Sequence, residues 1–302
     1  MIISIINEKC LLYSHPVSGL KKSLKVYYEA KNHFEESNFN TSLFISKYPN
    51  HIKDYISKID KNVFDRIVIF GGDGTINEVV NGLKDSNNLQ SFKIGIIPTG
   101  SGNSVAHDTD LLDVKAAIQK SIGSNIMKMD VNQVDFDSFS RLSVSVLGWG
   151  MFSFGNIRAE KLRMLGPIRY DVASIITLLE KKIHKAEIKV DGVHKLLECA
   201  FIVACNSKHT GKGMIVAPRG GFSDKKIDLI TVGKHVNRFQ VFEVFQKVYK
   251  GTHIDLPYVE NIQVDSFSID PGHKSFYNID GDIVESQKAS VRVIPEAINL
   301  LI

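Results

Sequence analysis

Two glycine-rich segments carry the residues of this chain that are best suited to chemistry. The first, residues 71–75 (GGDGT), follows the apolar run at 67–70. Glycines between a strand end and a helix start let backbone N–H groups approach a phosphate where the helix dipole is positive. Because Asp73 would repel a phosphate, it makes sense beside a bridging metal ion or as the acceptor of a proton from a substrate hydroxyl. A plain βα turn is the alternative, and this loop alone does not decide between them.

A second loop of the same kind follows at residues 98–103 (PTGSGN), after another predicted strand that begins at Lys93. Two neighbouring parallel strands would bring both loops to one edge of a sheet, where open α/β folds bind ligands. Neither loop is a Walker A motif, because no Gly-Lys-Ser/Thr follows, and neither has the spacing of a dinucleotide fingerprint. The pair nevertheless favours a nucleotide site over two unrelated turns.

The elements around these loops alternate between strand and helix up to about residue 128. The residues after the first loop predict a helix capped by Thr75 or Asn77, with an apolar side formed by Ile76, Val79, Val80 and Leu83. Further predicted elements are strands at 11–13 and 41–44 and helices over 20–36 and 50–59. This βαβ rhythm is typical of a parallel sheet.

Beyond residue 128 short β-branched runs dominate, and Asp191-Gly192 is a hairpin signal. The predicted strands are 130–134, 142–147, 187–190, 200–205, 227–232, 262–269 and 291–294. The sequence thus predicts an α/β domain over 1–128 and a mainly antiparallel β-sandwich domain over 129–302. Packing of the last residues back on the first domain is left open.

The composition is that of an ordinary soluble globular protein, with 43% hydrophobic and 23% charged residues. The net charge of +4 suits ATP or an anionic membrane surface but is too small to argue for nucleic acid. Cys10, Cys199 and Cys205 show no CxxC spacing, which argues for a reducing compartment and against a zinc site. The first residues, MIISII, are too short for a signal peptide, and no apolar run approaches a membrane span of about 20 residues. We therefore expect a cytoplasmic location.

A charged helical face forms the third candidate feature. Asn156, Glu160 and Arg163 are spaced i, i+4 and i+7, so they share one side of a helix, and Arg169 follows a Gly-Pro pair that ends it. Two arginines separated by a turn are suited to clamping a polyphosphate, because guanidinium groups bind phosphate oxygens in bidentate geometry. A solvated charged face is the alternative.

Taken together, these motifs are similar to a known family. GGDGT followed by PTGSGN resembles the diacylglycerol kinase and sphingosine kinase superfamily of lipid kinases, with NAD kinases as more distant relatives. Residues 14–23 (SHPVSGLKKS) resemble the family's first phosphate-side loop, and Ser46 and His51 resemble a short Thr-x-x-x-x-His element. Residues 147–170, which contain the run EKxRxxGxxR, resemble the sphingosine and ceramide kinase branch.

The resemblance implies an NAD kinase- and diacylglycerol kinase-like first domain, a β-rich lipid-substrate domain, and the use of ATP and Mg²⁺. It implies that Asp73 is catalytic and that Asn156 and Glu160 bind the substrate, but it does not identify the metal ligands. The nucleotide-binding residues that it implies are Gly19, Lys22, Ser46, Gly71, Gly72, Gly74, Thr75, Thr99, Gly100, Ser101, Gly102, Asn103, Arg163, Arg169, Asp280 and Gly281.

Several residues depart from the family pattern, among them Ser46, which replaces a threonine, and Phe154, which is apolar where related lipid kinases often place an aspartate. His15 replaces an asparagine, Lys225 a glycine, and Asp282 a glutamate that is one methylene longer. Asn156 stands where sphingosine kinases place an aspartate for the lipid head group. Its neutral amide favours a neutral acceptor over a sphingoid ammonium, whereas the surrounding EKLRMLGPIR favours the sphingosine branch.

The sequence therefore predicts an ATP-dependent lipid kinase that phosphorylates a primary hydroxyl of a sphingoid-type lipid, with diacylglycerol and ceramide as alternative acceptors. The rival classes are a catalytically weak lipid- or nucleotide-binding module and a soluble small-molecule kinase. We expect peripheral attachment to a membrane that holds the lipid substrate and no nucleic acid partner, and we leave a homodimer open. An apolar stripe within 172–183 would line an acyl-chain pocket or belong to the core.

Overall fold

The computed structural model describes residues 8–14, 22–162, 164, 173, 176, 182–211 and 213–302, without the side chains of 22–24, 156 and 159–161. The chain divides into two compact units. The first unit comprises Met1–Val131, Gly211–Gly213 and Pro295–Ile302, and the second comprises Asn132–Thr210 and Met214–Ile294. The predicted boundary at residue 128 lies inside strand β5 (Ile126–Phe136).

A parallel sheet forms the centre of the first unit. Its strands β1 (Lys9–Ser14), β2 (Asn40–Ile45), β3 (Arg66–Gly71) and β4 (Lys93–Pro98) lie in the order β2-β1-β3-β4. The last residues of β17 (Ala289–Leu301) add to β4 in parallel. This arrangement confirms the predicted α/β fold of the N-terminal part. The strand order reverses direction between β1 and β3, and ligands bind at such a switch point.

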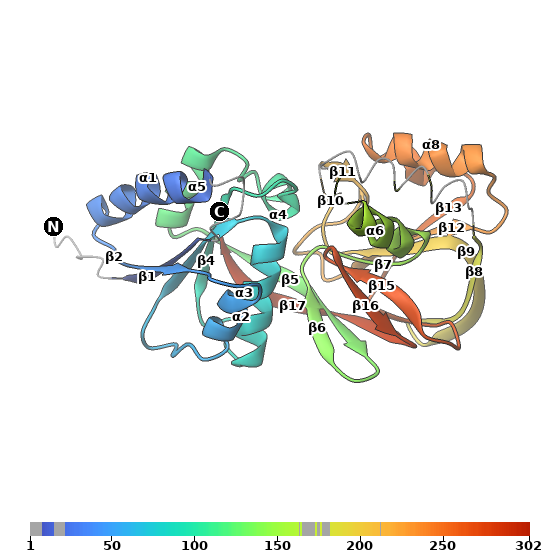
Figure 1. Ribbon diagram of the computed structural model, residues 1–302, viewed down its shortest axis with the longest axis horizontal. Coiled ribbons are helices and arrows are strands. Elements are labelled where there is room, and N and C mark those ends of the chain that lie inside the picture. The colour runs from blue at the N-terminus through green and yellow to red at the C-terminus, as the bar shows by residue number, and fades with distance from the viewer. Residues whose placement is uncertain are drawn as a thin grey trace. The chain divides into compact units, whose positions relative to one another are not determined.

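Helices cover both faces of this sheet (Figure 1). α1 (Lys22–Glu36) and α5 (Val114–Ile122) lie on one face, and α2 (His51–Ile56) and α3 (Asp73–Asp85) lie on the other. The predicted apolar side of α3 is buried, but the predicted cap is wrong. Gly72 is the N-cap residue and its carbonyl accepts the N–H groups of Thr75 and Ile76, so the helix begins at Asp73, inside the glycine loop.

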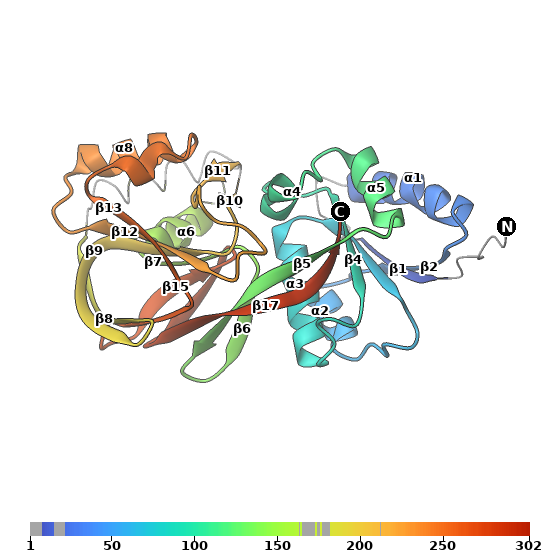
Figure 2. The ribbon, with the colours of Figure 1, turned by 180° about the vertical axis from the view of Figure 1, so that it is seen from behind.

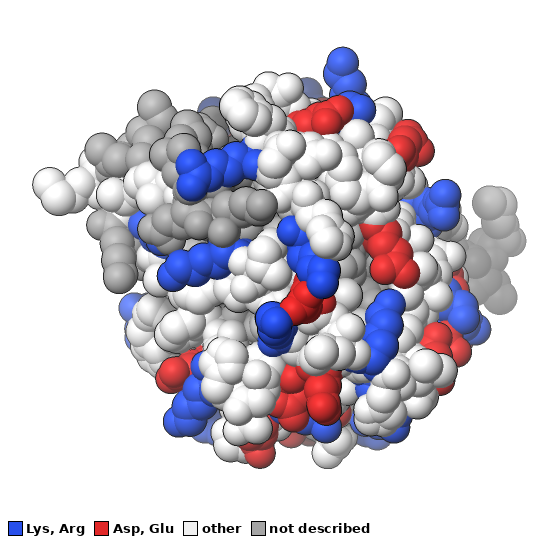
Figure 3. All heavy atoms as spheres, turned by 90° about the vertical axis from the view of Figure 1, so that its right-hand side faces the viewer, with Lys and Arg blue, Asp and Glu red and all other residues white. Residues whose placement is uncertain are grey.

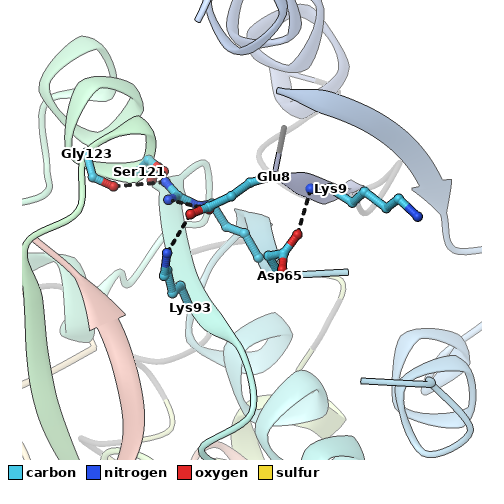
Figure 4. A network of polar contacts seen from close by, with 7 residues as sticks. Glu8, Lys9, Asp65, Lys93, Ser121 and Gly123 are labelled. Carbon is cyan, nitrogen blue, oxygen red and sulfur yellow. Dashed lines mark hydrogen bonds and ion pairs between the residues drawn. The ribbon is translucent and has the colours of Figure 1, made fainter. Parts of the chain in front are cut away.

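The amino ends of these strands are tied together by ionic contacts (Figure 4). The buried guanidinium of Arg66 donates to the Glu8 carboxylate at 2.8 Å and to the backbone carbonyls of Ser121 and Gly123. Lys93 binds the other oxygen of Glu8 at 2.6 Å. These contacts join β1, β3 and β4 at their amino ends. The glycine-rich loops lie at the opposite, carboxyl ends of β3 and β4.

The second unit is built from antiparallel strands, as predicted. They are β6 (Ser140–Ser143), β7 (Val146–Gly150), β8 (His184–Val190), β9 (Val193–Cys205), β12 (Ile227–Gly233), β13 (Val259–Val264), β14 (Ser266–Asp270), β15 (Ser275–Ile279) and β16 (Asp282–Ser286), with a short pair β10 (His209–Thr210) and β11 (Met214–Ile215). The predicted hairpin at Asp191-Gly192 joins β8 and β9, with both turn residues at positive φ.

Two predicted strands are each divided in the structure. Residues 142–147 contain the end of β6 and the start of β7, and residues 262–269 contain parts of β13 and β14. At each break, the backbone N–H groups donate hydrogen bonds to an aspartate carboxylate instead of a neighbouring strand. Asp280 binds the N–H groups of residues 144–146, and Asp191 binds those of Asp265 and Ser266.

The second half of β9, residues 199–205, is buried on both faces, which explains its continuous apolar sequence. Ile202 and Ala204 belong to a core cluster inside the sandwich, whereas Phe201 and Val203 belong to a second cluster on the outside of the strand. Helices α6 (Met151–Lys161) and α8 (Arg238–Val248) lie on the outer side of this strand (Figure 2). The sequence did not predict α8. Within the described ranges, no helix is long and apolar enough to cross a membrane.

Candidate functional site

The two glycine-rich loops lie side by side at the carboxyl ends of β3 and β4. Gly71 pairs with Pro98, and the Thr99 N–H donates to the Gly71 carbonyl at 3.1 Å. A Cβ atom on Gly100 would lie 2.5 Å from the Cα of Gly72, closer than real Cβ atoms approach. The loops therefore pack backbone to backbone, and the predicted adjacency of the two motifs is confirmed.

Asp73 lies where these loops meet a third element, the short helix α4 (Ser104–Asp108). Its carboxylate accepts a hydrogen bond from the Ser104 hydroxyl at 3.0 Å and another from the Val105 N–H at 3.3 Å. The Ser104 hydroxyl in turn accepts the N–H of Gly211 at 3.0 Å. These contacts fix the orientation of the Asp73 carboxylate, and its remaining lone pairs can accept a further donor.

Glycine at position 102 gives this carboxylate its space. A Cβ atom there would lie 2.8 Å from Oδ2 of Asp73. The following residue, Asn103, has a positive φ of 56°, and its amide donates to the Gly100 carbonyl at 2.9 Å. The second loop is thus held closed by its own asparagine, which turns the chain into α4.

Gly74 has no comparable steric reason to be glycine. It lies in the first turn of α3, where a Cβ atom would meet nothing within 4 Å. Glycine costs about 1 kcal/mol relative to alanine inside a helix, so its presence here suits the close approach of something outside the chain.

Several buried hydroxyl groups beside the loops, those of Ser14, Ser46 and Thr99, lack a hydrogen-bond partner among the described residues. Ser14 ends β1 and Thr99 directly follows β4. An unsatisfied buried hydroxyl costs about 1–3 kcal/mol, which a polar ligand at this edge would recover. Ser46, which follows β2, lies beside the phenol of Tyr13, whose pKa burial raises to about 12. The residues at this edge therefore fit a polar ligand.

Asp280 performs a structural task. Its carboxylate accepts the N–H groups of Val144, Ser145 and Val146 at 2.7–2.9 Å and the hydroxyl of Ser143 at 3.0 Å. Burial raises the pKa of this carboxyl, and the N–H donors act against that rise. Asp280 and Gly281 also form the tight turn between β15 and β16, with φ of 50° and 98°. Their expected place near the nucleotide stays a prediction.

Several predicted residues fall outside the described part of the chain. They are Gly19, Arg163 and Arg169, together with most of the apolar stripe at 172–183. Lys22 begins α1, and Asn156 and Glu160 lie in α6, but these three side chains are not described. The roles assigned to Thr75 and Ser101 stay predictions as well.

The departures from the family pattern can be followed at two positions. Lys225 has a positive φ of 60°, so it keeps the left-handed backbone for which glycine is usual. The Asp282 carboxylate pairs with the guanidinium of Arg141 at 2.6 Å.

Sequence reasoning missed Ser104 and Gly211, and it included Ser14 only as the first residue of the loop at 14–23. A serine directly after an asparagine that ends a glycine loop was the only local signal, and Gly211 lies far away in the sequence.

Two domain families match the chain. Residues 9–134 match the diacylglycerol kinase catalytic domain, and residues 145–302 match the YegS C-terminal NAD kinase beta sandwich-like domain. The chain belongs to the sphingosine kinase and diacylglycerol kinase superfamily of lipid kinases. The glycine loops and Asp73 lie in the first of these domains, and Asp280 lies in the second.

Relatives within this superfamily are distant. The chain is 25% identical to sphingosine kinase 1 of Arabidopsis thaliana, over 88% of its own length and 64% of the plant protein. It is 24% identical to a diacylglycerol kinase of Bacillus subtilis, over 91% of its own length and 90% of that protein. The crystal structure of a diacylglycerol kinase from Bacillus anthracis str. Sterne shares the fold, with a TM-score of 0.72, 15% identity, and coverage of 97% of this chain and 96% of that one.

Proposed function

We propose that this protein is an ATP-dependent kinase that transfers a phosphoryl group to a primary hydroxyl of a sphingoid-type lipid. One observation carries the proposal. The Asp73 carboxylate is held at the junction of two glycine loops that lie at the carboxyl ends of β3 and β4. Phosphoryl transfer needs little more than positioning and charge stabilisation, so such a junction suits it.

Each part of the junction has a task in this proposal. The loops at 71–75 and 99–103 bind the phosphates of ATP through N–H groups, and the unpartnered hydroxyls of Ser14 and Thr99 face a polar ligand. Asp73 orients the acceptor hydroxyl and accepts its proton as the new bond forms. Arg163 and Arg169, assigned by resemblance, neutralise charge on the transferred group.

Mg²⁺ would supply charge neutralisation at the phosphates of the bound nucleotide. The described residues include no group of three His, Cys, Asp or Glu that could hold a metal ion. Mg²⁺ is commonly bound through one or two carboxylates together with substrate phosphates, and Asp73 is the carboxylate that the loops offer.

The acceptor lipid belongs to the proposal and has a rival. Relatives include both sphingosine kinases and diacylglycerol kinases at similar identity, so a diacylglycerol or ceramide acceptor is the alternative. Asn156 provides the test, because an aspartate at this position would newly pair with a sphingoid ammonium. Such a charge-assisted hydrogen bond is worth about 1–3 kcal/mol.

The experiment incubates the protein with labelled ATP and micelles that contain sphingosine, ceramide or diacylglycerol. We expect phosphate transfer to sphingosine, and we expect the Asn156→Asp variant to raise the relative rate on sphingosine if the wild type prefers a neutral lipid. Transfer to none of these lipids, with ATP still bound, would favour a catalytically weak binding module. Replacing Arg163 or Arg169 by alanine should impair the kinetics of the enzyme toward ATP. Replacement by lysine should not restore these kinetics fully, because a point charge cannot reproduce the guanidinium fork.

A further inference from the structure

Helix α8 has two apolar faces. Val241, Val244 and Val248 are buried against the outer core cluster of the second unit. On the other side, Phe239 is 85% exposed, Phe242 is 48% exposed and Tyr249, just after the helix, is 58% exposed. The spacing of i, i+3 and i+10 aligns these three rings along one side of the helix. We call them the aromatic stripe.

Cations mark both ends of the aromatic stripe. Arg238 begins α8 and Lys250 follows Tyr249, both side chains are exposed, and neither has an acidic partner among the described residues. The acid nearest to the stripe in sequence, Glu243, is already engaged by Lys247 at 3.0 Å and by the Tyr258 hydroxyl at 2.6 Å. Figure 3, which views the molecule from the right-hand side of Figure 1, shows Lys and Arg side chains interspersed with Asp, Glu and uncharged residues on that side.

We propose that α8 docks the protein on an anionic lipid bilayer, and this inference rests on the proposed lipid kinase function. A helix that lies in a membrane interface buries aromatic rings at the level of the head groups and places Lys and Arg beside anionic lipids. The aromatic stripe with Arg238 and Lys250 at its ends matches this pattern, while the buried valines keep the helix attached to its own unit.

A second copy of the chain fits the stripe less well. In a two-fold contact the same surface meets itself, so residues at the ends of one helix face residues at the ends of the other. Because Arg238 and Lys250 are both cationic, parallel and antiparallel pairing each place a cation near a cation. An anionic surface removes that repulsion.

The experiment measures co-sedimentation of the full chain with phosphatidylcholine vesicles, with and without phosphatidylserine, in the absence of ATP. We expect binding only with phosphatidylserine, and binding that weakens as salt is added. The double variant Phe239→Ser/Phe242→Ser should bind roughly tenfold more weakly or worse, and Arg238→Glu/Lys250→Glu should lose the phosphatidylserine dependence.

Tyr28→Ser is the matched control, because it removes a 61% exposed ring from α1 in the other unit. It should bind vesicles like the wild type. Thermal unfolding should show that all variants are folded, since the changed side chains are exposed. Wild-type vesicle binding by both double variants would overturn the inference. Unchanged vesicle binding together with loss of a dimer would identify a second copy as the occupant.

A kinase assay separates this inference from the proposed function. On a short-chain lipid dispersed as single molecules, the α8 variants should turn over like the wild type, and they should fall behind only when the acceptor is embedded in vesicles. If the wild type fails on dispersed lipid but still binds vesicles through α8, the proposed activity is wrong and the docking surface stands.

Discussion

At the scale of single residues, glycine serves two different purposes within one site. Gly72 and Gly100 are required by the chain itself, because their backbones touch where the loops cross. Gly74 lies in the first turn of α3, and a Cβ atom at this position would have no neighbour within 4 Å. The same residue type therefore reports loop packing in one case and room for a ligand in the other.

This difference leads to a paired prediction. Gly100→Ala should lower the free energy of unfolding by at least 1–3 kcal/mol, roughly the cost of overpacking, because its Cβ would lie 2.5 Å from Gly72. Gly74→Ala should leave stability unchanged or raise it by up to about 1 kcal/mol, yet weaken ATP binding. Urea unfolding and ATP titration measure the two effects. If Gly74→Ala binds ATP normally, this loop does not hold the phosphates.

Asp73 gives a second prediction. Asp73→Asn should keep the fold and bind ATP nearly as well as the wild type, because the amide oxygen can still accept from Ser104. Turnover should fall by about a hundredfold or more, as expected when a general base is lost. Asp60→Asn, at an exposed turn, serves as the control. Near-normal turnover in the Asp73 variant would remove this carboxylate from the mechanism.

At the scale of elements, two aspartate carboxylates bind the backbone where one strand ends and the next begins. Asp280 holds three successive N–H groups between β6 and β7, and Asp191 holds two between β13 and β14. In both cases an aspartate in a tight hairpin turn reaches a distant segment. The turn thus fixes one pair of strands and the break between two others.

Removing the Asp280 carboxylate should therefore act on folding. Asp280→Ala leaves the N–H groups of Val144, Ser145 and Val146 without their acceptor, and stability should fall by about 3 kcal/mol or more. Calorimetric unfolding measures this loss. If the variant unfolds like the wild type but loses ATP affinity, Asp280 acts at the nucleotide and its structural role is secondary.

A buried acid in β12 makes stability depend on pH. Burial raises the pKa of Asp228 to about 6, and its carboxylate receives one long hydrogen bond from Gln263 at 3.4 Å. A carboxyl whose folded pKa lies above its unfolded value stabilises the fold only while protonated. Its contribution is complete below about pH 4 and is lost as the pH rises to about 6.

Asp228→Asn should therefore flatten the dependence of stability on pH across this window. At neutral pH the variant should be more stable, by up to about 3 kcal/mol for a shift of this size. Urea unfolding at acidic and neutral pH, with Asp60→Asn as the control, measures the difference. A variant with the pH profile of the wild type would show that Asp228 titrates normally.

Much of this organisation could be predicted from the sequence, because strand–glycine–helix patterns and Asp-Gly turns are local signals. Helix α8 was not predicted because its apolar residues occupy two faces. Phe239 and Val241 therefore do not belong to one helical stripe. The break between β6 and β7 was not predicted because Asp280 lies about 135 residues beyond the N–H groups that it binds. The support of Asp73 by Ser104 needs two loops to meet, and no short segment of sequence contains that information.

At the scale of the whole molecule, two strands belong to both units. β5 and β17 each start in one unit and continue into the other, and β17 pairs with β14 through its first residues and with β4 through its last. Glu296 lies between these two parts of β17 with a positive φ of 54°, and its N–H donates to the buried Asp130 carboxylate at 2.7 Å.

Deleting residues 295–302 tests how far the first unit depends on this strand. The deletion removes the partner of β4 and exposes a sheet edge, so the first unit should lose protection from hydrogen exchange while β8, β9 and β12 keep theirs. ATP binding should weaken, because the glycine loop after β4 depends on that strand. Full protection of β3 and β4 in the deleted chain would show that β17 is dispensable for the first unit.

The position of β17 also bears on the order in which the protein is built by the ribosome. The first unit reaches Val131 and, apart from Gly211–Gly213, is then interrupted until Pro295 emerges, a gap of about 160 residues. At roughly 5–20 residues per second, synthesis of that gap takes about 10–30 s. Throughout this interval β4 presents an unpaired edge, and the strands of the second unit are the first to be complete. The first unit is begun first and finished last, so a newborn chain completes its parallel sheet only after the second unit has been synthesised.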